Sequence, residues 1–141
     1  MDRRQRVSSG TAWEAQVGYS RAVRAPAGDT IVVSGTTATD ERGQLVGAGD
    51  PEAQARYIIA KIGRALAELG ASLEDVVRTR IYVANAADWP AIGRAHAAAF
   101  GAIRPANTLV EVSALIGEGY LVEIEADAII PSAERGMRNA E

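Results

Sequence analysis

The sequence predicts one α+β domain, in which two helices cover one face of a mixed sheet and the elements follow the order β-β-α-β-α-β-β. Segments rich in β-branched residues alternate with two segments of helical periodicity, which is typical of crossover connections between strands. A length of 141 residues suits a single domain. Right-handed crossovers place both helices on the same face, so this chain leaves the other face uncovered.

The first two strands are expected at residues 20–25 and 29–39. Pro26 and Gly28 mark a turn between them, so the two strands are predicted to form a hairpin. The clearest helix follows at residues 50–70, where Asp50 can cap the start, Pro51 fits the first turn and Gly70 fits the end. Its apolar stripe consists of Ile58, Ile62, Leu66 and Leu69.

The second half of the chain predicts a central strand at residues 76–84 and a second helix within 88–101. Two last strands are expected at 108–114 and 121–130. The folded core therefore spans about residues 17–130 of a single domain that covers residues 1–141. The polar ends, 1–10 and 132–141, are predicted to fray.

The uncovered face of the sheet carries charge. Strand alternation sends Glu123, Glu125 and Asp127 away from the helices, and it places Arg80 and Tyr82 on one side of the central strand. Asn107, Leu109 and Glu111 share one side of their strand, which we expect to be this same face. Apolar residues among paired charges favour a subunit interface over a solvated surface.

Composition excludes several classes of function. The net charge of −3 and the lack of a basic stripe argue against a nucleic-acid partner. No apolar run is long enough for a membrane span, and the N-terminal residues do not resemble a signal peptide, so a cytoplasmic location is expected. The chain has no cysteine and one histidine, and we expect no metal site and no cofactor.

Three features carry possible chemistry, and each has a structural alternative. Paired carboxylates can perform acid–base catalysis, but ion-pair networks also occur outside active sites. His96 lies on the apolar side of its helix, which favours a core histidine over a catalytic base. Tyr19, in "VGYS", can contact a small ligand or cover an edge of the sheet.

Several segments, in the same order along the chain, resemble the YjgF/RidA (Rid) family. They are "GYSRAV", "VVSGTTATDERGQLV", the helix after "DPEAQA", "LEDVVRTRIYV", "DWPAIGRAHAAAFG" and "RPANTLVEVSAL…LVEIEADAII". The resemblance implies a chorismate-mutase-like fold and a homotrimer whose uncovered sheet faces pack around a threefold axis. It also implies small-molecule clefts between subunits, in which reactive enamines or imines are hydrolysed to 2-oxo acids and ammonia. Other members are described as endoribonucleases or translation inhibitors.

The family's site residues carry over position by position. Glu123 matches the glutamate that positions the hydrolytic water, and Gly35 matches a glycine near the cleft. Tyr19 matches the tyrosine of "PYS", although Gly18 stands here in place of the proline. The main chain of Thr108 and Leu109 matches positions near the ligand.

Asn107 departs from the family pattern, because deaminating members have an arginine there to clamp the substrate carboxylate. Losing a charged contact of this kind costs about 2–5 kcal/mol when the partner is buried. Arg104 or Arg80 can replace the clamp if its side chain reaches the cleft, although Arg80 can instead pair with Glu111 or Glu125. The missing arginine argues against efficient deamination of 2-imino acids.

Three functions therefore compete. The first is a Rid-type hydrolase of an imine, an enamine or a related metabolite. The second is a homotrimer that binds a metabolite without converting it, and the sequence alone does not decide between these two. Endoribonuclease activity has the least support because basic residues are not clustered.

Overall fold

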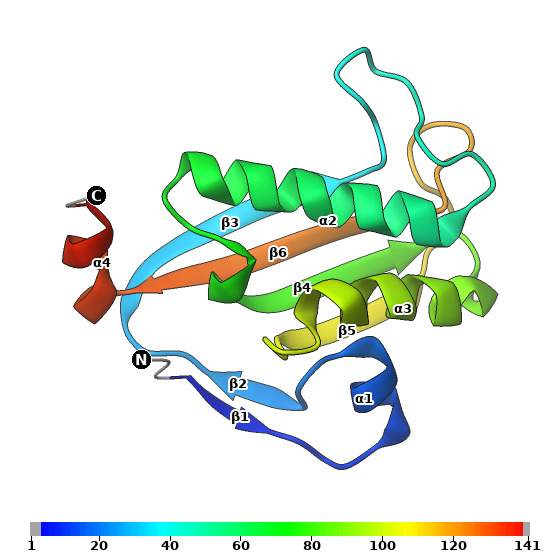
Figure 1. Ribbon diagram of the computed structural model, residues 1–141. Helices are drawn as coiled ribbons and strands as arrows, with labels where there is room; N and C mark the ends of the chain where they lie inside the picture. The colour runs from blue at the N-terminus through cyan, green and yellow to red at the C-terminus, as the bar shows by residue number, and fades with distance from the viewer. Residues whose placement is uncertain (1–3, 140–141) are drawn as a thin grey trace.

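The computed structural model describes residues 4–139, and Figure 1 shows α2 and α3 on the same face of the main sheet. The sheet has four strands, which are β3 (Gly28–Thr36), β6 (Val122–Pro131), β4 (Val76–Val83) and β5 (Ala106–Glu111), in this spatial order. Strand β6 pairs antiparallel with both β3 and β4, whereas β4 and β5 are parallel. The predicted mixed sheet is confirmed.

Helix α2 (Pro51–Glu68) begins where the sequence predicts. The Asp50 side chain accepts a hydrogen bond from the Ala53 amide at 3.0 Å, and Pro51 occupies the first turn. A 3₁₀ turn, η1 (Leu73–Asp75), leads into β4. A second one, η2 (Ala86–Asp88), leads into α3 (Trp89–Phe100).

The core lies between the sheet and the two long helices. Every second residue of β6 is buried, which confirms the predicted alternation, and these residues are Val122, Ile124, Ala126 and Ala128. They pack with Ile58, Ile62 and Leu66 of α2 and with Phe100 of α3. Each fully buried large apolar side chain contributes about 1.5–3 kcal/mol, so this layer holds the sheet rigid beneath any site built on its edges.

The predicted hairpin between the first two strands is wrong. Strand β2 (Ala22–Arg24) pairs antiparallel with β1 (Gln5–Val7), while β3 pairs with β6. The physical reason is the length of the available ladder. The ten residues of β6 can pair along most of β3, whereas β2 has only three residues.

Both ends have more secondary structure than the sequence predicted. Besides β1, the N-terminal part forms α1 (Ala12–Val17), and the C-terminal part forms α4 (Ser132–Asn139). Arg138 of α4 makes two hydrogen bonds, of 2.7 and 2.8 Å, to the buried carboxylate of Asp75. Such a paired contact fixes α4 against η1.

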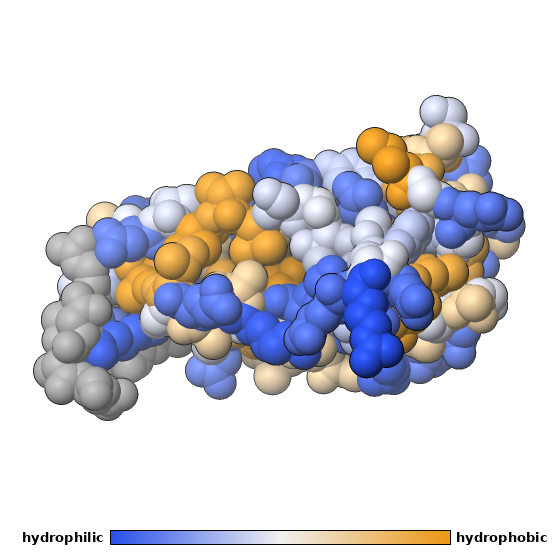
Figure 2. All heavy atoms as spheres, turned by 90° about the horizontal axis from the view of Figure 1, so that it is seen from above, coloured by the Kyte–Doolittle hydropathy of each residue, from blue (hydrophilic) through white to orange (hydrophobic). Residues whose placement is uncertain are grey.

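The surface is mixed in character. Figure 2, which looks down on Figure 1 from above, shows a band of hydrophilic residues beside a hydrophobic area. Exposed large apolar side chains include Val32 of β3 and Val110 of β5. Among the described residues, no helix is long and apolar enough to cross a membrane.

Candidate functional site

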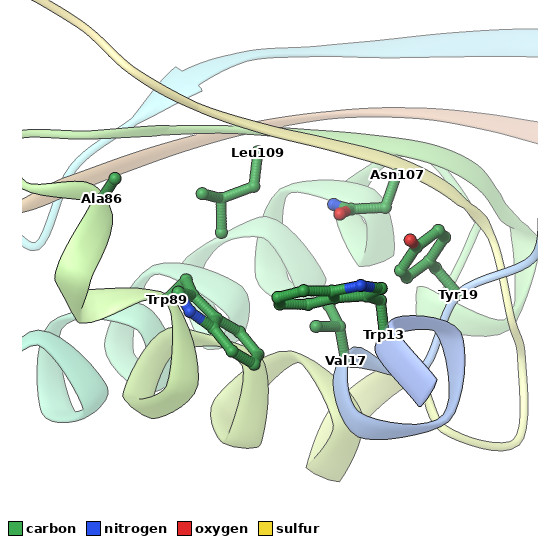
Figure 3. Close-up of a pocket in the computed structure, with 7 residues that line it drawn as sticks. All are labelled: Trp13, Val17, Tyr19, Ala86, Trp89, Asn107 and Leu109. Carbon is green, nitrogen blue, oxygen red and sulfur yellow. The ribbon is translucent and has the colours of Figure 1, made fainter. Parts of the chain in front are cut away.

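A cavity of about 270 Å³ opens at the β5 edge of the sheet, where α1, η2 and the start of α3 meet that strand. Seven residues line it, and Figure 3 shows all of them: Trp13, Val17, Tyr19, Ala86, Trp89, Asn107 and Leu109. The rings of Trp13 and Trp89 contact each other with centroids 4.5 Å apart and planes tilted by 57°. Two of its walls are therefore aromatic.

Helix α1 brings Trp13 to the cavity, and Glu14 holds this short helix in place. The buried Glu14 carboxylate accepts hydrogen bonds from the hydroxyls of Ser8, Ser9 and Thr11 and from the Ser9 amide. These donors, with the Ser9 hydroxyl foremost, lower the Glu14 pKa to about 2, although burial acts in the opposite direction. The carboxylate thus fastens the loop before α1 to the helix itself.

Gly18 ends α1 in a conformation that the family's proline cannot adopt. Its φ is +79°, in the left-handed region, and its amide donates to the Glu14 carbonyl at 2.8 Å. A Cβ atom here would lie 3.0 Å from the Cα of Ala97 and 3.1 Å from that of Gly101. Glycine therefore permits both the helix end and the close approach of α1 to α3.

The residues after Gly18 run beside the start of β5. The Ser20 hydroxyl donates to the Arg104 carbonyl at 2.6 Å, and the Ser20 amide donates to the Pro105 carbonyl at 3.0 Å. These bonds place Tyr19 next to Asn107 in the cavity wall (Figure 3).

Asn107 and Leu109 were expected on the uncovered face, and this prediction is wrong. In the parallel register, Asn107 lies opposite Thr79 and Leu109 lies opposite Ile81. Both partners are buried under the helices, and paired residues share a face. Alternation alone does not say which face an edge strand turns to the core, and α1 supplies the cover here that the sequence did not predict.

A chain of hydrogen bonds runs behind Asn107. Its Nδ2 donates to the Thr79 hydroxyl at 2.9 Å, Thr79 Oγ1 lies 2.8 Å from His96 Nε2, and His96 Nδ1 lies 2.7 Å from the Val17 carbonyl oxygen. Burial lowers the pKa of His96 to about 4, although the bond to Val17 favours the charged form. His96 is thus a core residue, as predicted, and it supports the wall of the cavity.

Glu123 and Gly35 lie together on the opposite, uncovered face. A Cβ atom added at Gly35 would overlap the Glu123 carboxylate oxygen Oε2, so the carboxylate rests directly over the glycine. Glu123 is half-buried and lies opposite Tyr82 in the β4–β6 pairing. Within one chain the sheet itself separates this carboxylate from the cavity that contains Tyr19 and Asn107.

The neighbouring charges on this face pair with one another. Arg80 lies 3.6 Å from Glu125 and 3.5 Å from Asp127. The Tyr82 hydroxyl donates to Glu125 at 2.5 Å, and this bond, together with burial, raises the Tyr82 pKa. Arg80 therefore pairs with Glu125, one of the two partners considered from the sequence, and with Asp127 as well.

Neither arginine considered as a replacement clamp lines the cavity. Arg80 belongs to the uncovered face with Thr108, its partner in the register. Arg104 has φ +59°, and its guanidinium donates to the carbonyls of Gly101 at 2.9 Å and Glu14 at 3.3 Å. Arg21 lies 5.9 Å from the centroid of the Tyr19 ring, and it too is absent from the cavity lining.

Sequence reasoning did not identify Trp13, Val17, Ala86 and Trp89 as site residues. The available signal was the spacing of Trp13 and Val17, which stand about one helical turn apart in a short segment. Trp89 stands beside Pro90 at the start of α3, a position without periodic pattern. Among the described residues, no cluster of three or more potential metal ligands occurs.

Comparison with known proteins agrees with this architecture. The family model described as endoribonuclease L-PSP matches residues 9–130. The crystal structure of Rv2704 from Mycobacterium tuberculosis is 52% identical, with a TM-score of 0.64 and coverage of 90% of this chain and 99% of that one. The Rid protein YyfB from Yersinia pestis is 34% identical, with a TM-score of 0.80 and coverage of 90% and 98%.

A relative with a named activity is 3-aminoacrylate deaminase RutC from Acinetobacter baylyi. It is 38% identical over 107 residues, which cover 75% of this chain and 84% of that protein. Residues 9–130, which the family model matches, include the lining of the cavity and both Gly35 and Glu123 of the uncovered face. The chain therefore belongs to the YjgF/RidA (Rid) family.

Proposed function

We propose that the protein is a homotrimeric hydrolase that releases ammonia from a small imine or enamine bound in clefts between its subunits. One observation carries this proposal. The residues that match the family's site are divided between the two faces of one sheet, with Tyr19 and Asn107 at the cavity and Gly35 and Glu123 on the uncovered face. A second copy is needed to bring the two halves together.

The uncovered face is suited to receive that copy. Val32 of β3 is 74% exposed and Val110 of β5 is 43% exposed, and both lie on this face opposite Asp127 and Tyr82. Exposed apolar side chains around paired charges are typical of a protein–protein interface. In a closed ring of three copies, the cavity edge of one subunit meets the Glu123 face of the next.

Glu123 is assigned the task of activating water. An enamine first becomes its imine tautomer. Water then bonds to the imine carbon while Glu123 accepts one of its protons. Glu123 passes this proton to the nitrogen, which gives a carbinolamine. The hydroxyl proton of the carbinolamine then moves to the nitrogen, the carbon–nitrogen bond breaks with its electron pair leaving on ammonia, and a carbonyl group remains. Tyr19 and the tryptophan rings hold the substrate beside the carboxylate of the neighbouring subunit.

Two substitutions test the role of Glu123 in an assay of ammonia release from imines and enamines generated in situ. Glu123→Gln keeps the size of the side chain but removes the base, so we expect kcat to fall roughly 100-fold or more. Gly35→Ala displaces the carboxylate and should lower kcat without unfolding the protein. Gly63→Ala is the matched control, because its Cβ meets Leu73 at an ordinary 3.7 Å. Equal activity in the wild type and all three variants would contradict the proposal.

The alternative is a trimer that binds a metabolite without converting it. For substrates that bear a carboxylate this reading is favoured, because no arginine of the described part of the chain lines the cavity. A binding protein shows a rise in melting temperature with ligand concentration but no ammonia release.

Endoribonuclease activity is tested separately by incubation with RNA at low salt. The cytoplasmic location predicted from the sequence belongs to the same proposal.

A further inference from the structure

In the chain of hydrogen bonds behind Asn107, the donor and the acceptor of each bond can be assigned in only one consistent way. The Val17 carbonyl can only accept, so His96 carries its proton on Nδ1, 2.7 Å away. In a neutral imidazole Nε2 is then an acceptor, and the Thr79 hydroxyl must donate to it across 2.8 Å. Thr79 has no second hydroxyl proton, so its oxygen accepts from the Asn107 amide at 2.9 Å.

The neutral state of His96 rests on its surroundings. Its side chain is fully buried, and Phe100 packs against the ring with centroids 4.6 Å apart. Within the described part of the chain, the ring nitrogens of His96 bond to a backbone carbonyl and a hydroxyl, neither of which is charged. Burying an imidazolium without a counter-charge is costly. The direction of the chain is therefore a property of the folded core.

This direction decides which atom Asn107 offers to a ligand. Its Nδ2 group donates to the Thr79 hydroxyl at 2.9 Å and contacts the Thr79 carbonyl oxygen at 3.5 Å, so both N–H groups turn toward β4. The side-chain oxygen Oδ1 is the atom left for the cavity. Figure 3 shows the Asn107 amide and the Tyr19 hydroxyl reaching toward the space above the Trp13 ring. Among the described residues, no charged side chain lines this cavity. A carboxylate could accept from the Tyr19 hydroxyl, but its second oxygen would then meet the acceptor oxygen Oδ1 of Asn107, whereas a neutral amide offers one acceptor and one donor to this pair.

We propose that Asn107 selects a neutral carboxamide head group, whose N–H donates to Oδ1 and whose carbonyl accepts from the Tyr19 hydroxyl. Thr79 acts as a positioning residue, because it fixes the orientation of the Asn107 amide without touching the ligand. For the reaction, this inference rests on the proposed function, and the substrate class becomes imines or enamines of amides rather than of free acids.

Binding is tested with the intact protein and two probes of the same shape, benzamide and benzoate, by titration calorimetry. We expect benzamide to bind at least tenfold more tightly than benzoate. Asn107→Leu should reduce this ratio to about one. Equal affinities in the wild type, a preference for benzoate, or no binding of either probe overturns the inference.

The positioning role of Thr79 is tested by the same ratio of benzamide affinity to benzoate affinity. Thr79→Val removes the hydroxyl that holds the amide, so the ratio should fall at least threefold, whereas Thr79→Ser should retain it. A ratio that is the same in both variants contradicts the positioning role. If Thr79→Val does not fold, the ratio in Thr79→Ser and Asn107→Leu still decides, since only the serine variant should keep it.

Turnover separates this inference from the proposed function. Hydrolysis of a 2-imino acid at a higher kcat/KM than its carboxamide counterpart overturns the inference and leaves the hydrolase proposal standing. A tenfold preference for benzamide without ammonia release from either imine supports the inference and contradicts the hydrolase proposal.

Discussion

His96 is a fully buried ionisable side chain, and it links stability to pH. Its pKa is lowered to about 4 by burial, whereas an unfolded histidine titrates near 6.5. Between these values the unfolded chain binds a proton that the folded chain does not. Stability from this group is therefore complete above about pH 6.5 and is lost as the pH falls toward 4.

We predict that the free energy of unfolding falls by roughly 2 kcal/mol between pH 7.5 and pH 5 through this single residue. Urea titrations at several pH values measure the change. The control is His96→Gln, which has no group that titrates in this range and should show a flatter profile. A wild-type stability that is constant over this range would contradict the assignment of His96 as a buried neutral side chain.

At the scale of an element, α1 is a six-residue helix too short to be stable alone. Its attachment depends on the Glu14 carboxylate and its bonds to Ser8, Ser9 and Thr11. Because the Glu14 pKa is lowered, this attachment is present above the ordinary pKa of a glutamate. It is lost as the pH falls toward 2.

We predict that Glu14→Ala speeds amide hydrogen exchange at residues 8–18 at least tenfold and leaves exchange in β4 and β6 unchanged. The reason is that local opening of α1 does not require the core to unfold. Gln16→Ala, on an exposed position of the same helix, is the matched control. Uniform acceleration across the whole chain would show that α1 is instead part of the cooperative core.

The elements that the sequence predicted well are those with a long repeating pattern. The alternation in β6 and the capped apolar stripe of α2 are local properties, and the structure agrees with the bounds of both elements within one or two residues. Leu69 is the exception in the stripe, because it lies just beyond the end of α2 and is exposed. Helix α1 was not predicted, because its stability comes from contacts outside the helix rather than from its own periodicity. The hairpin was mispredicted since a turn signal does not say which strand offers the longer ladder.

The candidate site, like the fold, was predicted from the sequence only in part. Family motifs pointed to Gly35 and Glu123, and the structure brings these two together. The aromatic walls were not predicted, because Trp13 and Trp89 stand near the starts of their helices without a repeating pattern. The face of Asn107 depends on the parallel register of an edge strand and on the cover provided by α1. Neither is encoded within the strand itself.

At the scale of the whole molecule, the proposed trimer makes Val32 an interface residue. We predict that Val32→Glu yields a folded monomer or a weakened trimer, because the charge would be buried against a neighbouring copy. Sedimentation velocity measures the mass of the particle. Leu69→Glu is the control, since Leu69 is 64% exposed at the end of α2, in the helical layer. A monomeric wild type would rule out the trimer.

The separation of Asn107 and Glu123 by one sheet has a genetic consequence. If each cleft takes Asn107 from one copy and Glu123 from the next, two inactive chains can complement each other. We predict that refolding equal amounts of Asn107→Leu and Glu123→Gln chains together restores about a quarter of the clefts, because every mixed ring of three contains one intact pairing. The ammonia assay of the mixture measures this recovery, and each variant refolded alone should stay inactive. A cell carrying both defective alleles would therefore keep part of the activity that neither allele supplies by itself.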